Sequence, residues 1–123
     1  MKKLMIVDDS NLIRKKIARE FDQSKFDLVA SADSGEQAVM LFETHRPEIV
    51  TMDITMPHLD GIGCIERLVK IDSKIKILVI SALNDKATGM EALEKGAMGF
   101  INKPFSQQEI VEALDTLTEG DDV

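Results

Sequence analysis

The sequence predicts a single α/β domain of the doubly wound type, in which a five-stranded parallel sheet is covered by helices on both faces. Three observations support this prediction. Short apolar, β-branched segments alternate five times with segments of helical periodicity. The connections between them are short, as is typical of right-handed crossovers between parallel strands. The fourth strand segment is apolar almost throughout, which indicates a strand buried on both faces.

The expected strands end at residues that a buried strand tolerates poorly. They are placed at Leu4–Val7, Leu28–Ala32, Ile49–Met52, Ile75–Ile80 and Gly99–Ile101. The adjacent acids Asp8 and Asp9 stop the first strand. The third strand ends at a lone carboxylate, Asp53, and Pro57 prevents it from resuming because proline cannot donate to the ladder.

The expected helices begin at good N-caps and carry one apolar stripe each. Ser10 caps the first helix, and Ser34 with Gln37 has the spacing of a capping box at the start of the second. The later helices are placed at Ile62–Ile71, Lys86–Lys95, with Gly96 as the terminating C′ glycine, and Ser106–Leu117. The buried stripes are expected to be Ile13, Ile17 and Phe21; Ala38, Leu41 and Phe42; Ile65, Leu68 and Val69; and Ile110, Ala113, Leu114 and Leu117. Residues 1–118 would form the domain, and residues 119–123 a flexible acidic tail.

Composition restricts the function classes. At 123 residues the chain is one domain, and its net charge of −7 would repel nucleic acids and anionic membranes. Its only dense basic patch, Arg14-Lys15-Lys16, is interpreted as the solvated face of the first helix. No apolar run is long enough to span a membrane. Cys64 is the sole cysteine, so no intrachain disulfide can form and a cytoplasmic setting is expected.

Chemically reactive side chains follow four of the five expected strands. Asp8 and Asp9 come after the first, Asp53 ends the third, Ser81 ends the fourth and Lys103 follows the fifth. In open parallel sheets, ligands bind outside the carboxyl ends of the strands, where the strand order reverses. Carboxylates that gather at such an edge do so mainly around a cation.

Four motifs carry a resemblance to a known family. They are Ile6-Val7-Asp8-Asp9-Ser10, Met52-Asp53-Ile54-Thr55-Met56-Pro57 followed by Asp60-Gly61, Ile80-Ser81-Ala82, and Lys103-Pro104-Phe105. In this order and spacing, the sequence resembles the receiver domain of two-component response regulators over residues 2–117, and most closely the stand-alone CheY-like chemotaxis regulators. The resemblance implies a flavodoxin-like sheet with strand order 2-1-3-4-5.

The resemblance also assigns chemistry to the clustered residues. Asp53 would accept a phosphoryl group from a phosphohistidine and form an acyl phosphate. Asp8, Asp9, Asp53 and the backbone carbonyl of Thr55 would hold Mg²⁺, with Mn²⁺ as a possible substitute. Lys103 would pair with Asp53 at rest and with the phosphoryl group afterwards, and its bond to Pro104 is commonly cis in the family. Mutual repulsion among the acids should raise the pKa of at least one of them in the metal-free form.

Further positions are implied to act in switching and in the lifetime of the phosphoryl group. The Ser81 hydroxyl would donate to the phosphoryl group, and its movement would let the Phe100 ring turn from exposed to buried. Thr55 and Leu83 would flank the path of the hydrolytic water, and the apolar Leu83 predicts slow loss of phosphate. Phe100 packing simply as a core residue is nearly as good an interpretation.

The implied protein is a monomeric signalling phosphoacceptor rather than an enzyme. Its donor would be a CheA-like histidine kinase, and a flagellar switch protein or a phosphatase could bind the surface formed by the fourth helix, fifth strand and fifth helix. That surface would include Ala87, Met90, Glu91, Glu94, Lys95 and Phe100.

Other functions remain open from the sequence. A phosphorelay intermediate or phosphate sink outside chemotaxis would have the same motifs, and so would a receiver cut from a longer DNA-binding or enzymatic regulator. A haloacid-dehalogenase-type phosphohydrolase would carry its nucleophile in an Asp-x-Asp pair after the first strand instead. A flavodoxin would need a glycine- and hydroxyl-rich phosphate loop there, where Asp8 and Asp9 would repel a phosphate.

Overall fold

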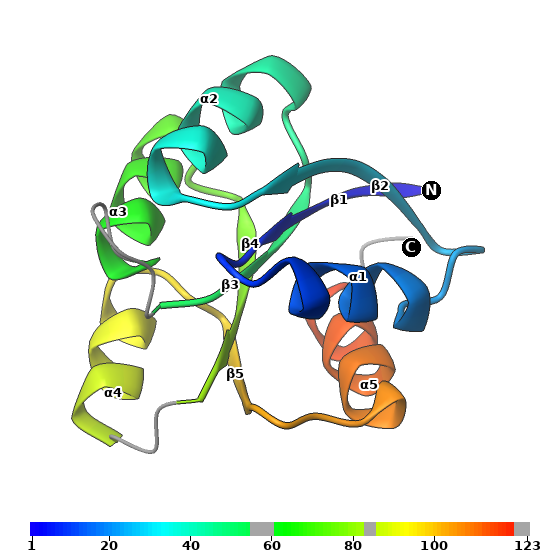
Figure 1. Ribbon diagram of the computed structural model, residues 1–123. Coiled ribbons are helices and arrows are strands. Elements are labelled where there is room, and N and C mark those ends of the chain that lie inside the picture. Colours follow the sequence, from blue (N-terminus) through cyan, green and yellow to red (C-terminus); the bar gives the residue numbers. More distant parts are fainter. Residues whose placement is uncertain (55–60, 83–85, 120–123) are drawn as a thin grey trace.

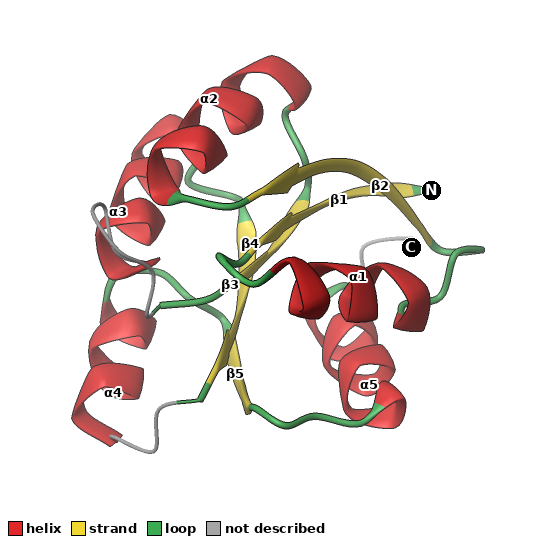
Figure 2. Ribbon diagram, viewed as in Figure 1, coloured by secondary structure: helices red, strands yellow, loops and turns green. Residues whose placement is uncertain are grey.

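The protein is a parallel sheet between two layers of helices (Figures 1 and 2). The computed structural model describes residues 1–54, 61–82 and 86–119. The strands are β1 (Lys2–Val7), β2 (Phe26–Ala32), β3 (Ile49–Met52), β4 (Lys76–Ser81) and β5 (Gly99–Asn102). The helices are α1 (Asn11–Glu20), α2 (Gly35–His45), α3 (Gly61–Ile71), α4 (Lys86–Glu94) and α5 (Gln107–Leu117). The strand order is β2-β1-β3-β4-β5 and every pairing is parallel, which confirms the expected fold.

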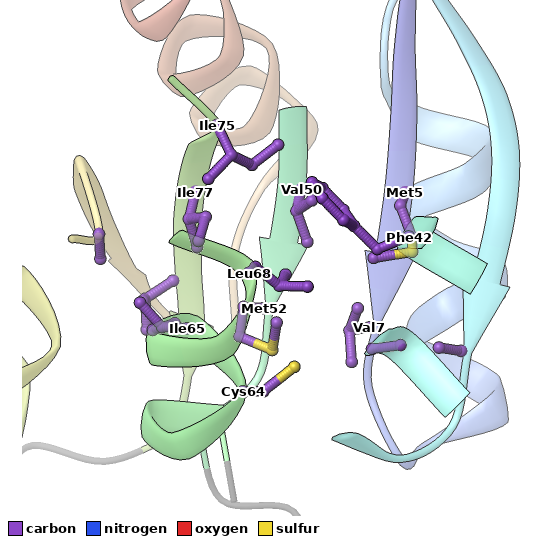
Figure 3. Packing of buried hydrophobic residues seen from close by; sticks show 14 of the residues in the cluster. Met5, Val7, Phe42, Val50, Met52, Cys64, Ile65, Leu68, Ile75 and Ile77 are labelled. Atoms are coloured by element: carbon purple, nitrogen blue, oxygen red, sulfur yellow. The ribbon is translucent and has the colours of Figure 1, made fainter. Parts of the chain in front are cut away.

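The two helical layers bury two separate cores. Helices α2, α3 and α4 cover one face of the sheet, and α1 and α5 cover the other (Figure 1). In the first core, Phe42 of α2 and Leu68 of α3 pack with Met5 and Val50 of the central strands (Figure 3). In the second, Ile17 and Phe21 of the α1 segment pack with residues of α5. Of the expected stripe residues, Ile13, Leu41, Val69, Ala113 and Leu117 are only partly buried at the margins of these cores.

Burial of the strands follows their position in the sheet. All four residues of β3 are buried, and so are the last four of β1 and the last five of β4. The edge strands β2 and β5 are partly exposed. The central strands therefore had to be apolar on both faces, which is why they could be recognised in the sequence.

The helix caps agree with the sequence in part. Ser10 and Ser34 accept N–H groups from the third residue of their helices, as expected. The Gln37 side chain, however, accepts the N–H of Asp33 instead of that of Ser34, so the predicted reciprocal box is only half formed. Gln37 reaches one residue too far back to close it. A complete capping box, which was not predicted, starts α5 at Ser106.

Gly96 ends α4 as predicted. Its φ of +125° lies in the region that favours glycine. The N–H of Gly96 donates to the carbonyl of Leu93 at 3.2 Å, and that of Ala97 to the carbonyl of Ala92 at 3.0 Å. This pair of bonds is a Schellman motif, and it turns the chain from α4 into β5.

Within the described residues, no helix is both long and apolar enough to cross a membrane.

Candidate functional site at the carboxyl ends of the strands

Backbone hydrogen bonds fix three of the candidate residues at the same edge of the sheet. The N–H of Asp8 donates to a backbone carbonyl of β2 at 3.0 Å, the N–H of Asp53 to a backbone carbonyl of β1 at 2.9 Å, and the N–H of Lys103 to a backbone carbonyl of β4 at 2.8 Å. Each bond continues a strand ladder by one residue. The site residues therefore take their positions from the rigid sheet and not from free loops.

An acidic cluster lies at this edge. Asp8, Asp9 and Asp53 each place one carboxylate oxygen within 4.8 Å of the others. Asp8 and Asp53 are only 1% and 2% exposed, whereas Asp9 faces the solvent. The sequence prediction that these three acids converge is thus confirmed by the geometry. Asp8 and Asp53 are thus buried carboxyl groups, and a buried carboxylate is costly unless an opposite charge or hydrogen-bond donors stabilise it.

Lys103 supplies the opposing charge. Its Nζ lies 2.7 Å from Oδ2 of Asp8 and 3.7 Å from Oδ2 of Asp53. The predicted pairing with Asp53 is present, but the closer partner is Asp8, which the sequence did not indicate. The bond between Lys103 and Pro104 is cis, as expected.

The pKa of the Asp8 carboxyl is raised above its ordinary value. Burial is the main cause, and the nearby charge of Asp53 adds to it. Hydrogen bonds from Lys103 and from the N–H of Ser10, the latter at 2.9 Å, act in the opposite direction. The expectation of a raised pKa is confirmed, although desolvation contributes more than the repulsion from which it was predicted.

The basic patch on α1 is not the solvated face that the sequence suggested. Arg14 is partly buried and donates from Nη1 to the backbone carbonyl of Asp8 at 2.6 Å. Lys16 is also partly buried and donates to the backbone carbonyl of Phe105 at 3.1 Å. Only Lys15 is exposed. The spacing of four between Lys16 and Glu20 indicates their ion pair, but such pairs are typical of solvated helix faces, so the sequence held no signal for the other contacts of Arg14 and Lys16.

Gly61 allows α3 to begin directly against the nucleophile candidate. A Cβ at this position would collide with the carbonyl oxygen of Asp53 and with Cα of Ile54, and would lie 2.8 Å from Cγ2 of Ile54. Only glycine permits this approach of the helix to the backbone that carries Asp53.

The two residues assigned to a switch lie on neighbouring strands. Ser81 is fully buried at the end of β4. Phe100 in β5 is partly buried, and its ring lies beside Gly89 of α4, 3.4 Å from where a Cβ on that glycine would be. Thr55 and Leu83, to which the resemblance assigned metal binding and lifetime, lie outside the described residues, as does the side chain of Ala87.

The family is decided by comparison with known proteins. The family model of the response regulator receiver domain matches residues 4–115. The chain belongs to this family. As a receiver domain, it is a phosphoacceptor of two-component signalling, which sets aside the phosphohydrolase and flavodoxin alternatives.

Several relatives of this receiver domain are single-domain chemotaxis proteins. It is 38% identical to the chemotaxis protein CheY of Thermotoga maritima over 118 residues, covering 96% of this chain and 98% of the relative. It is 37% identical to CheY of Bacillus subtilis, covering 92% and 94%. Among solved structures, CheY in the CheX–CheY–BeF₃–Mg complex of Borrelia burgdorferi aligns with a TM-score of 0.89 and 33% identity, covering 94% of this chain and 88% of that one.

Proposed function

We propose that Asp53 is the phosphoacceptor and that it takes a phosphoryl group from a histidine kinase in a Mg²⁺-dependent reaction. The observation that supports this most directly is the buried Asp53 carboxylate with an ammonium at 3.7 Å and two further carboxylates beside it. One Asp53 oxygen would attack phosphorus, while the bond from phosphorus to the histidine nitrogen breaks and its electron pair leaves with the imidazole.

The donor set at the edge suits a hard divalent cation. Asp8, Asp9 and Asp53 offer only oxygen ligands, which Mg²⁺ and Mn²⁺ prefer. Three carboxylates against the single ammonium of Lys103 leave a formal excess of two negative charges among these side chains. When bound, the cation would neutralise charge on the carboxylates and on the incoming phosphoryl oxygens. The backbone carbonyl of Thr55 is proposed as a further ligand from the resemblance alone.

Lys103 is proposed to stabilise the phosphoryl group. Its ammonium already lies between Asp8 and Asp53, so a short side-chain movement would bring it to an oxygen on phosphorylated Asp53. An ammonium is well suited to this because it has three donors on a flexible stem. In the resting state the same ammonium compensates the buried charge of Asp8.

The output is proposed to pass from Ser81 to Phe100. The Ser81 hydroxyl can donate to a phosphoryl oxygen, and the ring of Phe100, on the neighbouring strand β5, lies beside Gly89 of α4. Ser81→Ala is expected to keep phosphate incorporation but to remove the change in Phe100 ring resonances that phosphorylation causes in an NMR spectrum. An unchanged response in Ser81→Ala would contradict this route.

The partners are proposed to be those of a chemotaxis receiver. A CheA-like kinase would be the donor, and a flagellar switch protein or a phosphatase would bind α4, β5 and α5. In α4 and just before β5, the large apolar side chains of Met90, Leu93 and Met98 are 61%, 48% and 54% exposed, which leaves apolar area on this face for a partner to cover. The Borrelia relative was solved in a complex with CheX, which supports a protein partner of this kind.

Phosphate incorporation from acetyl phosphate tests the central assignment. Wild type is expected to take up acid-stable, base-labile phosphate with Mg²⁺, and Asp53→Asn to take up none. Asp33→Asn is the matched control, because this exposed acid follows edge strand β2 and its loss changes the charge equally. Equal labelling of Asp53→Asn and wild type, or labelling that does not respond to Mg²⁺, would contradict the proposal.

A further inference from the structure

Lys16 contacts the segment that follows β5 as well as its own helix. Its Nζ lies 2.6 Å from Oε1 of Glu20 and 3.1 Å from the backbone carbonyl oxygen of Phe105. The same ammonium lies 4.4 Å from the centroid of the Phe105 ring, within cation–π range. Phe105 is itself buried in the core between α1, α5 and the sheet. Lys16 therefore joins α1 to the segment that follows β5.

This segment carries Lys103. Phe105 lies two residues after Lys103, and the Lys103 N–H is held by the Ser81 carbonyl at 2.8 Å. The short stretch from 103 to 105 is thus fixed at both ends, by β4 on one side and by Lys16 on the other. The Lys103 ammonium, on its long and flexible stem, is aimed from this stretch toward Asp8 and Asp53.

Helix α1 also holds the other half of the ion pair. The Ser10 N–H donates to Oδ1 of Asp8 at 2.9 Å, and Arg14 donates to the Asp8 backbone carbonyl at 2.6 Å. The end of the helix is tied to α5 as well, because Gln107 donates to the backbone carbonyl of Glu20 at 3.2 Å. One rigid element therefore sets the position of Asp8 directly and that of Lys103 through Phe105.

We propose that Lys16 is a positioning residue for phosphoryl transfer, which holds the Phe105 carbonyl and ring so that the Lys103 ammonium stays beside Asp8 and Asp53. The inference rests on the proposed function, since it assigns Lys103 a part in the reaction. Misplacing a charged group by about 1 Å can cost up to about 100-fold in rate. A lysine held by fewer contacts would spend less time in the productive position.

The variant Lys16→Met tests this because it removes the ammonium and keeps an unbranched apolar side chain. Labelling from acetyl phosphate is expected to slow by about tenfold. Lys15→Met, the same change at the adjacent exposed lysine, is expected to label at the wild-type rate. Lys16→Arg should recover most of the rate, because a guanidinium can also donate to the carbonyl and stack on the ring. A wild-type rate in Lys16→Met would overturn the proposal.

A double-mutant cycle separates positioning from general stability. In a Lys103→Ala background, Lys16→Met is expected to have little further effect, because the group it positions is gone. The same tenfold loss in both backgrounds would overturn the proposal in favour of a structural role.

A readout without phosphate distinguishes this inference from the proposed function. Hydrogen exchange of the Lys103 ammonium protons, followed by ¹⁵N NMR, should be slow in wild type and Lys15→Met and faster in Lys16→Met. If wild type takes up no phosphate, the proposed function fails, yet this exchange still decides whether Lys16 positions Lys103. Equal exchange in the three proteins would overturn the inference.

Discussion

Replacing Gly61 by alanine should damage both the fold and the site, because of where the added methyl group would go. It would collide with two backbone atoms, the carbonyl oxygen of Asp53 and Cα of Ile54, and would lie 2.8 Å from the Ile54 Cγ2 methyl. Carbon atoms attract each other best at about 3.5–4.0 Å, so the start of α3 or the backbone of Asp53 must move by roughly 1 Å. A clash with a flexible side-chain tip could be relieved more cheaply.

The expected loss in the free energy of unfolding is about 2 kcal/mol. Overpacking costs typically about 1–3 kcal/mol, and this clash belongs in the upper part of the range because it involves backbone. Alanine is less flexible than glycine in the unfolded chain, and this offsets the loss by only about 0.4–1 kcal/mol. With an unfolding entropy of about 2.1 cal/mol/K per residue, the 123-residue chain should lose roughly 8 °C in Tm.

Gly89→Ala is the matched control for this prediction. Its Cβ would meet the Phe100 ring at 3.4 Å, an ordinary contact, inside helix α4. Because alanine is favoured over glycine there by about 0.8–1.0 kcal/mol, this variant should be more stable than wild type. Urea denaturation measures both changes, and phosphate labelling should fall in Gly61→Ala alone. If Gly61→Ala were as stable as wild type, the inferred close approach of α3 to Asp53 would be wrong.

Buried polar groups provide three further tests. At a free Mg²⁺ concentration 100 times its Kd, wild type should gain about 2.7 kcal/mol in the free energy of unfolding and Asp53→Asn much less; equal gains in thermal denaturation would argue against the proposed ligand. Thr51→Val should stabilise the protein by about 1 kcal/mol in urea, because the buried Thr51 hydroxyl has no hydrogen-bond partner among the described residues; a loss of stability would contradict this reasoning. The pKa of Asp8 in the folded protein is raised above the ordinary value of 3.8. The stability that protonated Asp8 contributes is therefore fully present below pH 3.8 and is lost as the pH rises through the folded-state pKa. The metal-free Asp8→Asn variant should therefore gain stability relative to wild type as the pH rises toward neutrality, and a difference independent of pH would refute the assignment.

The sequence predicted the site's main residues because their placement depends on local features. An apolar run that stops at an acid marks the carboxyl end of a strand, and parallel strands bring such ends to one edge. Asp8, Asp9 and Asp53 could be grouped by this reasoning alone. The strand order came from the resemblance, since alternation of strands and helices does not fix which strands are neighbours.

The choice of partners within the site could not be predicted in the same way. Lys103 reaches both Asp8 and Asp53, and which carboxylate it approaches more closely depends on the relative positions of three strands and one loop. The capping boxes show a milder form of the problem. Ser34 with Gln37 and Ser106 with Glu109 have the same spacing, yet only the second closes, because the glutamine finds another N–H nearby.

The misinterpreted basic patch shows how the core governs the site. Ile17 and Phe21 are buried against α5 and the sheet, and this burial fixes the rotation of α1 about its axis. Once that rotation is fixed, Arg14 must lie beside β1 and Lys16 beside the segment after β5, while Lys15 faces the solvent. A polar position next to an apolar stripe is therefore not necessarily solvated, because whatever borders the core there becomes its neighbour. In this receiver domain those neighbours are the backbone of Asp8 and the segment that carries Lys103, so the packing of α1 and the geometry of the acidic cluster depend on the same few residues.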